Sequence, residues 1–277
     1  MKTTMTAAGL AALALSAQAN AADLGARPYT KAPPMIAAPI YNWTGFYAGI
    51  NAGYGFSDRD TITTTGQVLA NVNNVNGGAR PGTVNLSRDG FVGGGQIGYN
   101  WQTGPNWVFG IETDIQYTDF NRTTTVVTAP LPPTAGTLNN TFTTKMDYFG
   151  TVRGRLGYTW GATMLYGTGG FAYGGVDNSA SFFGPPAFAG QLQFVGRDRS
   201  TRTGYTVGGG IEHMFSPNWS VKAEYLYYDL GSSNLNVAVI PGSGGGGTGY
   251  STTIRNDGHI VRAGLNYKFG GPVVARY

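Results

Sequence analysis

The chain has 277 residues, among them 45 glycines and no cysteine, and its formal net charge is only +4. The lack of cysteine excludes disulfides and thiolate metal sites, and a small, unclustered excess of positive charge gives no support to nucleic-acid binding. Charged residues make up 12% of the chain and aromatic residues 13%, and Thr, Asn and Gly fill much of the remainder, so the composition favours strands and turns. We therefore predict one all-β domain.

The first residues have the pattern of an export signal. Lys2 supplies a positive charge, residues 7–17 form a short apolar core, and Ala19 and Ala21 are small residues at the −3 and −1 positions of a cut before Ala22. A second cut, after Ala19, fits the same rule. Because the apolar core is too short to span a membrane as a helix, we predict residues 1–21 to be a cleaved signal peptide.

After Trp43, apolar and polar residues alternate in segments of strand length. The predicted strands cover residues 46–56, 88–102, 107–119, 146–160, 163–177, 202–215, 219–230 and 259–269. Short turns alternate with longer polar loops at residues 57–87, 121–144, 178–201 and 231–253, and the four glycines at 244–247 predict that the last loop is mobile. Proline-rich residues 22–42 and residues 270–277 are predicted tails that flank a domain over residues 43–269.

One face of each clearly alternating strand is apolar and the other is polar or charged. The predicted polar face carries Glu112, Asp114, Arg153, Arg155, Glu212, Lys222, Glu224, Arg262 and Lys268. A soluble barrel would have to bury these charges in a narrow core, whereas the interior of a membrane barrel lets them pair with one another and with trapped water. We therefore predict lipid outside and a charge network in the lumen, with Glu112 or Asp114 paired to Arg153 or Arg155 across adjoining strands.

A heptapeptide pattern recurs at the ends of four strands, at residues 95–101, 154–160, 209–215 and 263–269. Each copy ends in an aromatic residue, with Tyr or His two positions earlier. The pattern places Tyr99, Trp101, Tyr158, Trp160, His213, Phe215, Tyr267 and Phe269 on one face and at one level. Aromatic residues at one level of a membrane barrel form a girdle at the membrane interface, and we predict that role for this set.

Five motifs resemble a known family. They are Trp43-Thr-Gly-Phe-Tyr-Ala-Gly49, Gly95-Gln-Ile-Gly-Tyr-Asn-Trp-Gln102, Arg153-Gly-Arg-Leu-Gly-Tyr158, Glu224-Tyr-Leu-Tyr-Tyr-Asp-Leu-Gly231 and Ala263-Gly-Leu-Asn-Tyr-Lys-Phe269. The chain resembles the small outer-membrane β-barrel proteins of Gram-negative bacteria that are related to the opacity proteins.

The resemblance implies an eight-stranded antiparallel up-and-down transmembrane β-barrel in the outer membrane. It also implies that both termini are periplasmic, that four loops are exposed at the cell surface, and that the barrel-assembly machinery reads the aromatic end of the last strand. Here eight residues follow Phe269 and end in a second aromatic residue, Tyr277, so either aromatic end fits that signal.

Catalytic and cofactor motifs find little support. Residues 93–98 fit G-x-G-x-x-G, but the strand continues where a dinucleotide-binding loop would begin a helix. His213 and His259 are the only histidines, and His213 occupies a girdle position. Ser220 is close to His213 but has no evident acid partner, which disfavours a hydrolase. We expect no catalytic residue, metal or cofactor.

These observations predict a non-enzymatic outer-membrane protein that contributes to membrane structure and presents its loops to other molecules. The alternatives are a small porin or diffusion channel and, less favoured, a lipid-modifying enzyme. Expected partners are outer-membrane lipid and lipopolysaccharide, the barrel-assembly machinery, and an unidentified host, phage or haem ligand at the loops. The protein is expected to be monomeric and to bind no nucleic acid.

Overall fold

The computed structural model describes residues 41–57, 60–129, 136–185 and 190–270. The predicted signal peptide, the predicted tail before Tyr41 and the segment after Gly270 lie outside the described residues. In the described part of the chain, no helix is long and apolar enough to cross a membrane.

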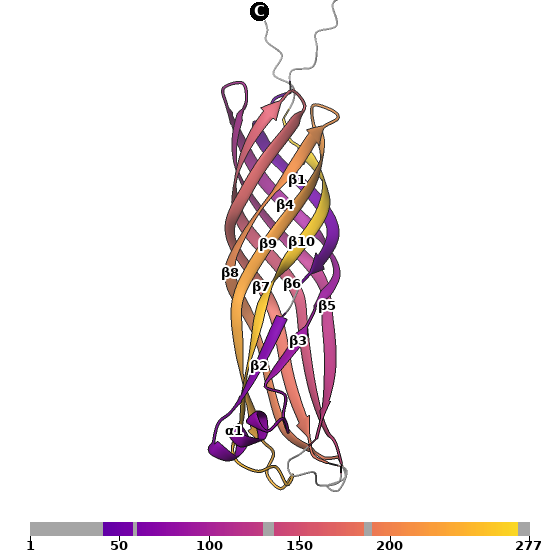
Figure 1. Ribbon diagram of the computed structural model, residues 1–277. Helices are drawn as coiled ribbons and strands as arrows, with labels where there is room; N and C mark the ends of the chain where they lie inside the picture. Colours follow the sequence, from indigo (N-terminus) through magenta and orange to yellow (C-terminus); the bar gives the residue numbers. More distant parts are fainter. Residues whose placement is uncertain (1–40, 58–59, 130–135, 186–189, 271–277) are drawn as a thin grey trace, which may run out of the picture. The chain divides into compact units, whose positions relative to one another are not determined.

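A single antiparallel sheet forms the domain (Figure 1). Its strands are β1 (Gly45–Phe56), β2 (Asp60–Gly66), β3 (Thr83–Leu86), β4 (Asp89–Thr103), β5 (Trp107–Thr128), β6 (Leu138–Trp160), β7 (Thr163–Phe183), β8 (Leu192–Met214), β9 (Trp219–Val239) and β10 (Gly249–Lys268). The described residues contain one α-helix, α1 (Leu69–Asn76). The all-β prediction is thus confirmed, but the sheet has ten strands where eight were expected.

The ring of hydrogen bonds closes because β1 pairs with β4 on one side and with β10 on the other. The expected contact between the first and last strands is present, with Tyr54 opposite Val261 and Ala48 opposite Tyr267. Around the ring the order is β1, β4, β5, β6, β7, β8, β9 and β10, and all of these neighbours are antiparallel.

The two further strands come from residues 57–87, which were predicted to be a polar loop. Beyond the end of β1, β2 takes over the edge of β10, with Ile62 opposite Ile254, and β3 pairs with β2. The sequence pattern did not reveal these strands because each contributes few apolar residues, Ile62 on β2 and Val84 and Leu86 on β3, between runs of Thr and Asn. Figure 1 shows β2, β3 and α1 at the end of the barrel opposite the short turns.

The long strands also run through the other predicted loops. β5 and β6 have 22 and 23 residues, and β7 and β8 have 21 and 23, so most of the sequence expected to be loop continues the sheet. The glycine-rich fourth loop is likewise shorter than expected, because β9 reaches Val239 and β10 begins at Gly249. We call this continuation, with β2, α1 and β3, the distal half of the barrel, and the part nearer the short turns the proximal half.

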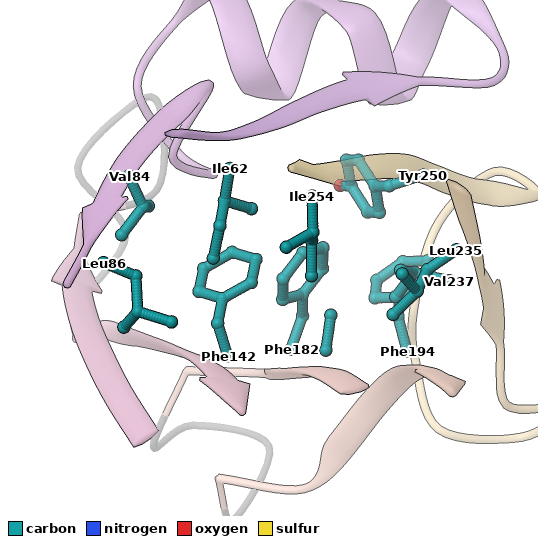
Figure 2. Packing of buried hydrophobic residues seen from close by; sticks show 11 residues of the cluster. Ile62, Val84, Leu86, Phe142, Phe182, Phe194, Leu235, Val237, Tyr250 and Ile254 are labelled. Atoms are coloured by element: carbon teal, nitrogen blue, oxygen red, sulfur yellow. The ribbon is translucent and has the colours of Figure 1, made fainter. Parts of the chain in front are cut away.

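The buried apolar residues form separate layers along the barrel. The distal half encloses a cluster of Ile62, Val84, Leu86, Phe142, Ala180, Phe182, Phe194, Leu235, Val237, Tyr250 and Ile254. Figure 2 shows Phe142, Phe182 and Phe194 pointing from one side of the barrel toward residues of the opposite side. Tyr250 packs edge-on against two of these rings, at 5.2 Å from Phe182 and 5.0 Å from Phe194.

Candidate functional site

The centre of the proximal lumen holds a network of buried charges. Glu112 on β5 lies directly opposite Arg153 on β6, and the two form an ion pair. Arg153 also reaches Asp114 at 3.0 Å and, across the lumen, Glu224 on β9 at 3.0 Å. The pairing predicted between β5 and β6 is therefore present, and Arg153 extends it to a strand that is not its neighbour.

Strands on the far side of the barrel complete the same network. Arg262 on β10 donates to Glu224 at 2.7 Å and to Asp114 at 3.0 Å. The Lys222 ammonium lies 2.9 Å from both carboxylate oxygens of Glu112. Glu112 on β5 is thus bound by Arg153 on β6 and by Lys222 on β9. Because β5 and β9 lie on opposite sides of the ring, these contacts hold opposite walls of the barrel together.

A second centre of charge surrounds Arg155. Its guanidinium pairs with Glu212 at 2.6 Å, donates to the Tyr47 hydroxyl at 2.8 Å and lies 4.1 Å from the centre of the Tyr166 ring. Tyr47 donates in turn to Glu112 at 2.7 Å, which links Arg155 to the Arg153 group. Four bases, Arg153, Arg155, Lys222 and Arg262, thereby face four acids, Glu112, Asp114, Glu212 and Glu224.

Lys268, the ninth side chain assigned to the lumen by the sequence, is absent from the network. It is the last residue of β10, it is about half-buried, and its ammonium binds the Asn42 carbonyl oxygen. Alternation along β10 predicted the correct side for Lys268 but not its depth, because Lys268 lies six residues beyond Arg262, at the rim of the barrel.

Apolar layers lie on both sides of the charge network. Toward the short turns, Trp43 is 1% exposed and packs with Val108, Met164, Tyr166 and Met214. Toward the distal half, the lumen contains Val92, Phe120, Met146, Phe149, Ala172, Val176, Leu226, Tyr228, Leu230 and Ile260. The distal cluster comes beyond this layer. Side chains therefore occupy successive levels of the lumen in the described part of the chain.

The predicted girdle residues all face outward. Trp160 is 51% exposed and Phe215 is 57% exposed, and the imidazole of His213 shares a hydrogen bond of 2.9 Å with Thr163. At the same level the structure adds aromatic residues that the repeat did not include, namely Phe46, Trp107, Phe109 and Trp219. Trp219 packs against Tyr267 with ring centres 5.0 Å apart.

A second girdle, which the sequence analysis missed, lies farther along the same strands. It consists of Tyr54, Phe56, Phe91, Tyr117, Tyr148, Phe171, Tyr173, Tyr205, Tyr225, Tyr227 and His259. Trp107 and Tyr117 are ten residues apart on β5; at a rise of about 3.4 Å per residue and a tilt of about 40°, the girdles are separated by about 26 Å. That separation matches the apolar band of about 25 Å in outer-membrane barrels.

Two other candidate sites are not supported by the geometry. Ser220 is buried in the lumen and donates to Glu212 at 2.6 Å, whereas His213 is on the outer surface, so the two cannot act as a catalytic pair. The G-x-G-x-x-G run lies within β4, and a side chain at Gly94 would come within 2.0 Å of the Ile115 carbonyl oxygen. These glycines allow close strand packing. The described residues contain no group of three side chains that could hold a metal.

Comparison with known proteins gives consistent matches over most of the chain. A family model for the outer membrane protein beta-barrel domain matches residues 5–269. The 31 kDa outer-membrane immunogenic protein of Brucella melitensis is 39% identical over 248 residues, which cover 86% of this chain and 88% of that protein. A 22 kDa outer membrane protein of Rhizobium leguminosarum bv. viciae is 29% identical over 83% of this chain and 80% of its own length. Among solved structures, the outer membrane protein OprG from Pseudomonas aeruginosa aligns with 84% of this chain and all of its own, with 16% identity and a TM-score of 0.49.

Proposed function

The chain belongs to the outer membrane protein beta-barrel domain family, and on that premise we propose that it is a non-enzymatic structural protein whose barrel is closed to solutes. It resides in the outer membrane of a Gram-negative bacterium. We further propose that the eight strands of the hydrogen-bonded ring cross the membrane between the two aromatic girdles. The short turns then face the periplasm and the distal half faces the outside, as is usual for such barrels.

The filled lumen is the observation that carries this proposal. An eight-stranded barrel is only wide enough for its own side chains, and here the charge network is bounded by apolar layers on both sides. An ion entering from either end would have to pass Trp43 or Phe149, both fully buried, before it met a charged group. That packing supports a barrel closed to solutes over a static channel.

Conductance measurements test the closed barrel. The refolded full-length chain, inserted into planar bilayers, should show no stable open state, and vesicles containing it should exclude small sugars and amino acids. A known porin at equal protein density serves as the positive control. Reproducible unitary currents, or solute entry at rates similar to those of the porin, would favour the diffusion channel.

Surface exposure of the distal half is the second part of the proposal. The Brucella melitensis relative is named a 31 kDa outer-membrane immunogenic protein, and for this chain we propose that the distal half is exposed at the cell surface, without assigning a partner. Antibodies raised against residues 69–76 should bind intact cells if α1 is outside. Binding that appears only after the outer membrane is permeabilised would reverse the proposed orientation.

The last strand supplies the proposed assembly signal. Tyr267 and Phe269 are exposed on the outer surface beside Trp219 and Phe46, so closure of the barrel does not bury them. Deleting residues 270–277 should leave insertion close to wild type, whereas Phe269→Ala in that truncated chain should reduce the inserted fraction severalfold. Heat-modifiable migration of outer-membrane fractions measures both. Loss of insertion on truncation alone would assign the signal to Tyr277.

A further inference from the structure

A polar hollow lies on the outer surface immediately above the second girdle. Asp147, Tyr148, Gly175, Arg199 and Thr201 line a depression of about 300 Å³ that crosses β6, β7 and β8. Gly175 forms its floor because a side chain there would come within 2.4 Å of the Tyr148 ring. Above this floor the Tyr148 hydroxyl shares a hydrogen bond of 2.8 Å with Thr201.

One exposed cation, Arg199, lines the hollow, and two more, Lys145 and Arg197, lie beside it on the same outer face. Lys145 on β6 and Arg199 on β8 lie opposite Asp177 on the strand between them, so the three side chains form one row across the outer face. The next row contributes Arg197, whose guanidinium binds Asp177 through two hydrogen bonds. These hydrogen bonds hold the pKa of the Asp177 carboxyl below its usual range, so Asp177 stays ionised and Arg197 is neutralised locally.

Arg199 and Lys145 make longer ion-pair contacts than Arg197 does. The Arg199 side chain is 70% exposed and lies 3.5 Å from Asp147, which is also 4.0 Å from the Lys145 ammonium. Apart from Asp177, which Arg197 binds directly, the two cations thus share one carboxylate at long distance. Exposed ion pairs of this kind are weak, so a phosphate could replace Asp147 as the partner of both cations at little cost and gain charge-assisted hydrogen bonds.

The depth of the hollow determines which phosphate it would meet. Below it, Val152, Phe171 and Val207 are each about half-exposed and form the apolar outer face of the same three strands. A ligand that contacts both the cations at the hollow and the apolar face below it would need an anionic headgroup of about the size of a sugar, joined to hydrocarbon chains. We propose that β6, β7 and β8 bind the phosphorylated headgroup of an outer-leaflet glycolipid, with a phosphate between Lys145 and Arg199 and the acyl chains along the apolar face. This inference rests on the proposed orientation, with the distal half outside.

The opposite side of the barrel offers a matched control. Arg255 on β10 is also exposed above the second girdle, at 56% for its side chain, but it lies between Asp257 at 3.5 Å and Asp229 at 4.0 Å. Two carboxylates flank one cation there, which disfavours a phosphate. Arg255→Gln therefore removes a charge whose exposure, 56%, lies between those of Lys145 and Arg199, and it leaves the proposed site unchanged.

Binding to defined lipids tests the site in the full-length protein held in detergent micelles with EDTA. Bisphosphorylated lipid A should bind the wild type at least tenfold more tightly than Lys145→Gln/Arg199→Gln, a difference of about 1.4 kcal/mol. Arg255→Gln should stay within twofold of the wild type, and lipid A without phosphates should bind all three proteins equally weakly. Equal weakening by Arg255→Gln, or no weakening by the double substitution, would overturn the proposal.

Two further arms separate this ligand from other anions. Inorganic phosphate at millimolar concentration should not displace lipid A, and heparin, a soluble sulfated polysaccharide, should not bind with comparable affinity; either result would assign the cations to a ligand other than a glycolipid. Heat-modifiable migration shows that each variant is folded, and antibody access to α1 on intact cells tests the orientation separately. Failure of lipid binding in a folded, correctly oriented protein therefore overturns this site while leaving the proposed function unaffected.

Discussion

Arg153 is the side chain on which the lumen depends most directly. It contacts Glu112, Asp114 and Glu224, and its side chain is fully buried. Removing one member of a buried ion group leaves an uncompensated charge, which costs about 3–5 kcal/mol, although the intact group itself adds little net stability. The network therefore matters chiefly because it requires one register of β5, β6, β9 and β10.

Arg153→Gln should accordingly lower the free energy of unfolding by about 3–5 kcal/mol. Lys268→Gln is the matched control, because Lys268 is also a cation on the polar face of its strand but binds only a neutral carbonyl oxygen at the rim. Its substitution should change the free energy of unfolding by less than about 0.5 kcal/mol. Urea unfolding in lipid vesicles, followed by tryptophan fluorescence, measures both. Equal stabilities for the two variants would mean that the ion pairs do not hold the strands together.

At the scale of elements, the β2–α1–β3 segment is attached to the barrel by polar side chains as well as by strand pairing. Asn71 of α1 is fully buried, donates to the Gly246 carbonyl at 2.9 Å and accepts from the backbone of Thr248. Arg80 donates to Asn140 at 2.8 Å and to the Phe183 carbonyl at 2.9 Å. Burial lowers the pKa of Arg80, and the rings of Phe182 and Phe194 lie over its guanidinium.

Asn71→Ala should free residues 240–248 from α1 while leaving the ring of strands intact. The substitution removes a buried hydrogen-bond donor and acceptor, which should lower the free energy of local opening of residues 240–248 by about 1–3 kcal/mol. Hydrogen exchange in residues 240–248 should accelerate at least fivefold, whereas Asn73→Ala, on the exposed side of α1, should cause no change. Acceleration throughout β9 and β10 would contradict a local role.

The outer face of β5 changes character along its length. Ile111, Ile115 and Tyr117 are more than half exposed, and beyond them Asn121, Thr123 and Thr125 occupy the same face. If the membrane ends at the second girdle, a cation placed before Tyr117 on this face would contact lipid, whereas one placed at Thr123 or Thr125 would contact water.

Ile111→Arg should therefore destabilise the inserted barrel by about 2–4 kcal/mol, the cost of a cation near the bilayer midplane, while Thr125→Arg should cost less than about 1 kcal/mol. Guanidinium unfolding in vesicles gives the two values. A comparable cost at both positions would move the membrane boundary beyond Thr125.

Across the whole domain, the polarity of the barrel reverses between the two halves. In the proximal half apolar residues face outward and charges face the lumen, whereas in the distal half Thr and charged residues face outward and Phe142, Phe182 and Tyr250 fill the interior. The proposed membrane placement explains both halves. Lipid would solvate the apolar outer face of the proximal half, and water would surround the distal half, which has an apolar core of its own.

Phe182→Ala should loosen the distal half without preventing insertion. Loss of a buried Phe costs about 3–5 kcal/mol, and this residue contacts the rings of Phe142 and Tyr250 in the core of the distal half. Protease cleavage of residues 190–205 and 232–250 should increase on whole cells, while heat-modifiable migration remains. Phe91→Ala, which removes an exposed ring at the second girdle, serves as the control.

The sequence alone determined the two faces of the proximal strands, because strict alternation assigns Glu112 to one face and Ile111 to the other whatever the partner strand. It also revealed one girdle, because four copies of a short pattern end in aromatic residues. The tertiary structure decided everything that depends on register between distant strands. Only the pairing of β6, β7 and β8 places Lys145, Asp177 and Arg199 in one row, and only the closed ring brings Glu224 and Arg262 to Arg153 while leaving Lys268 at the rim. Depth along the barrel is a property of the sheet, whereas alternation along one strand specifies only the side.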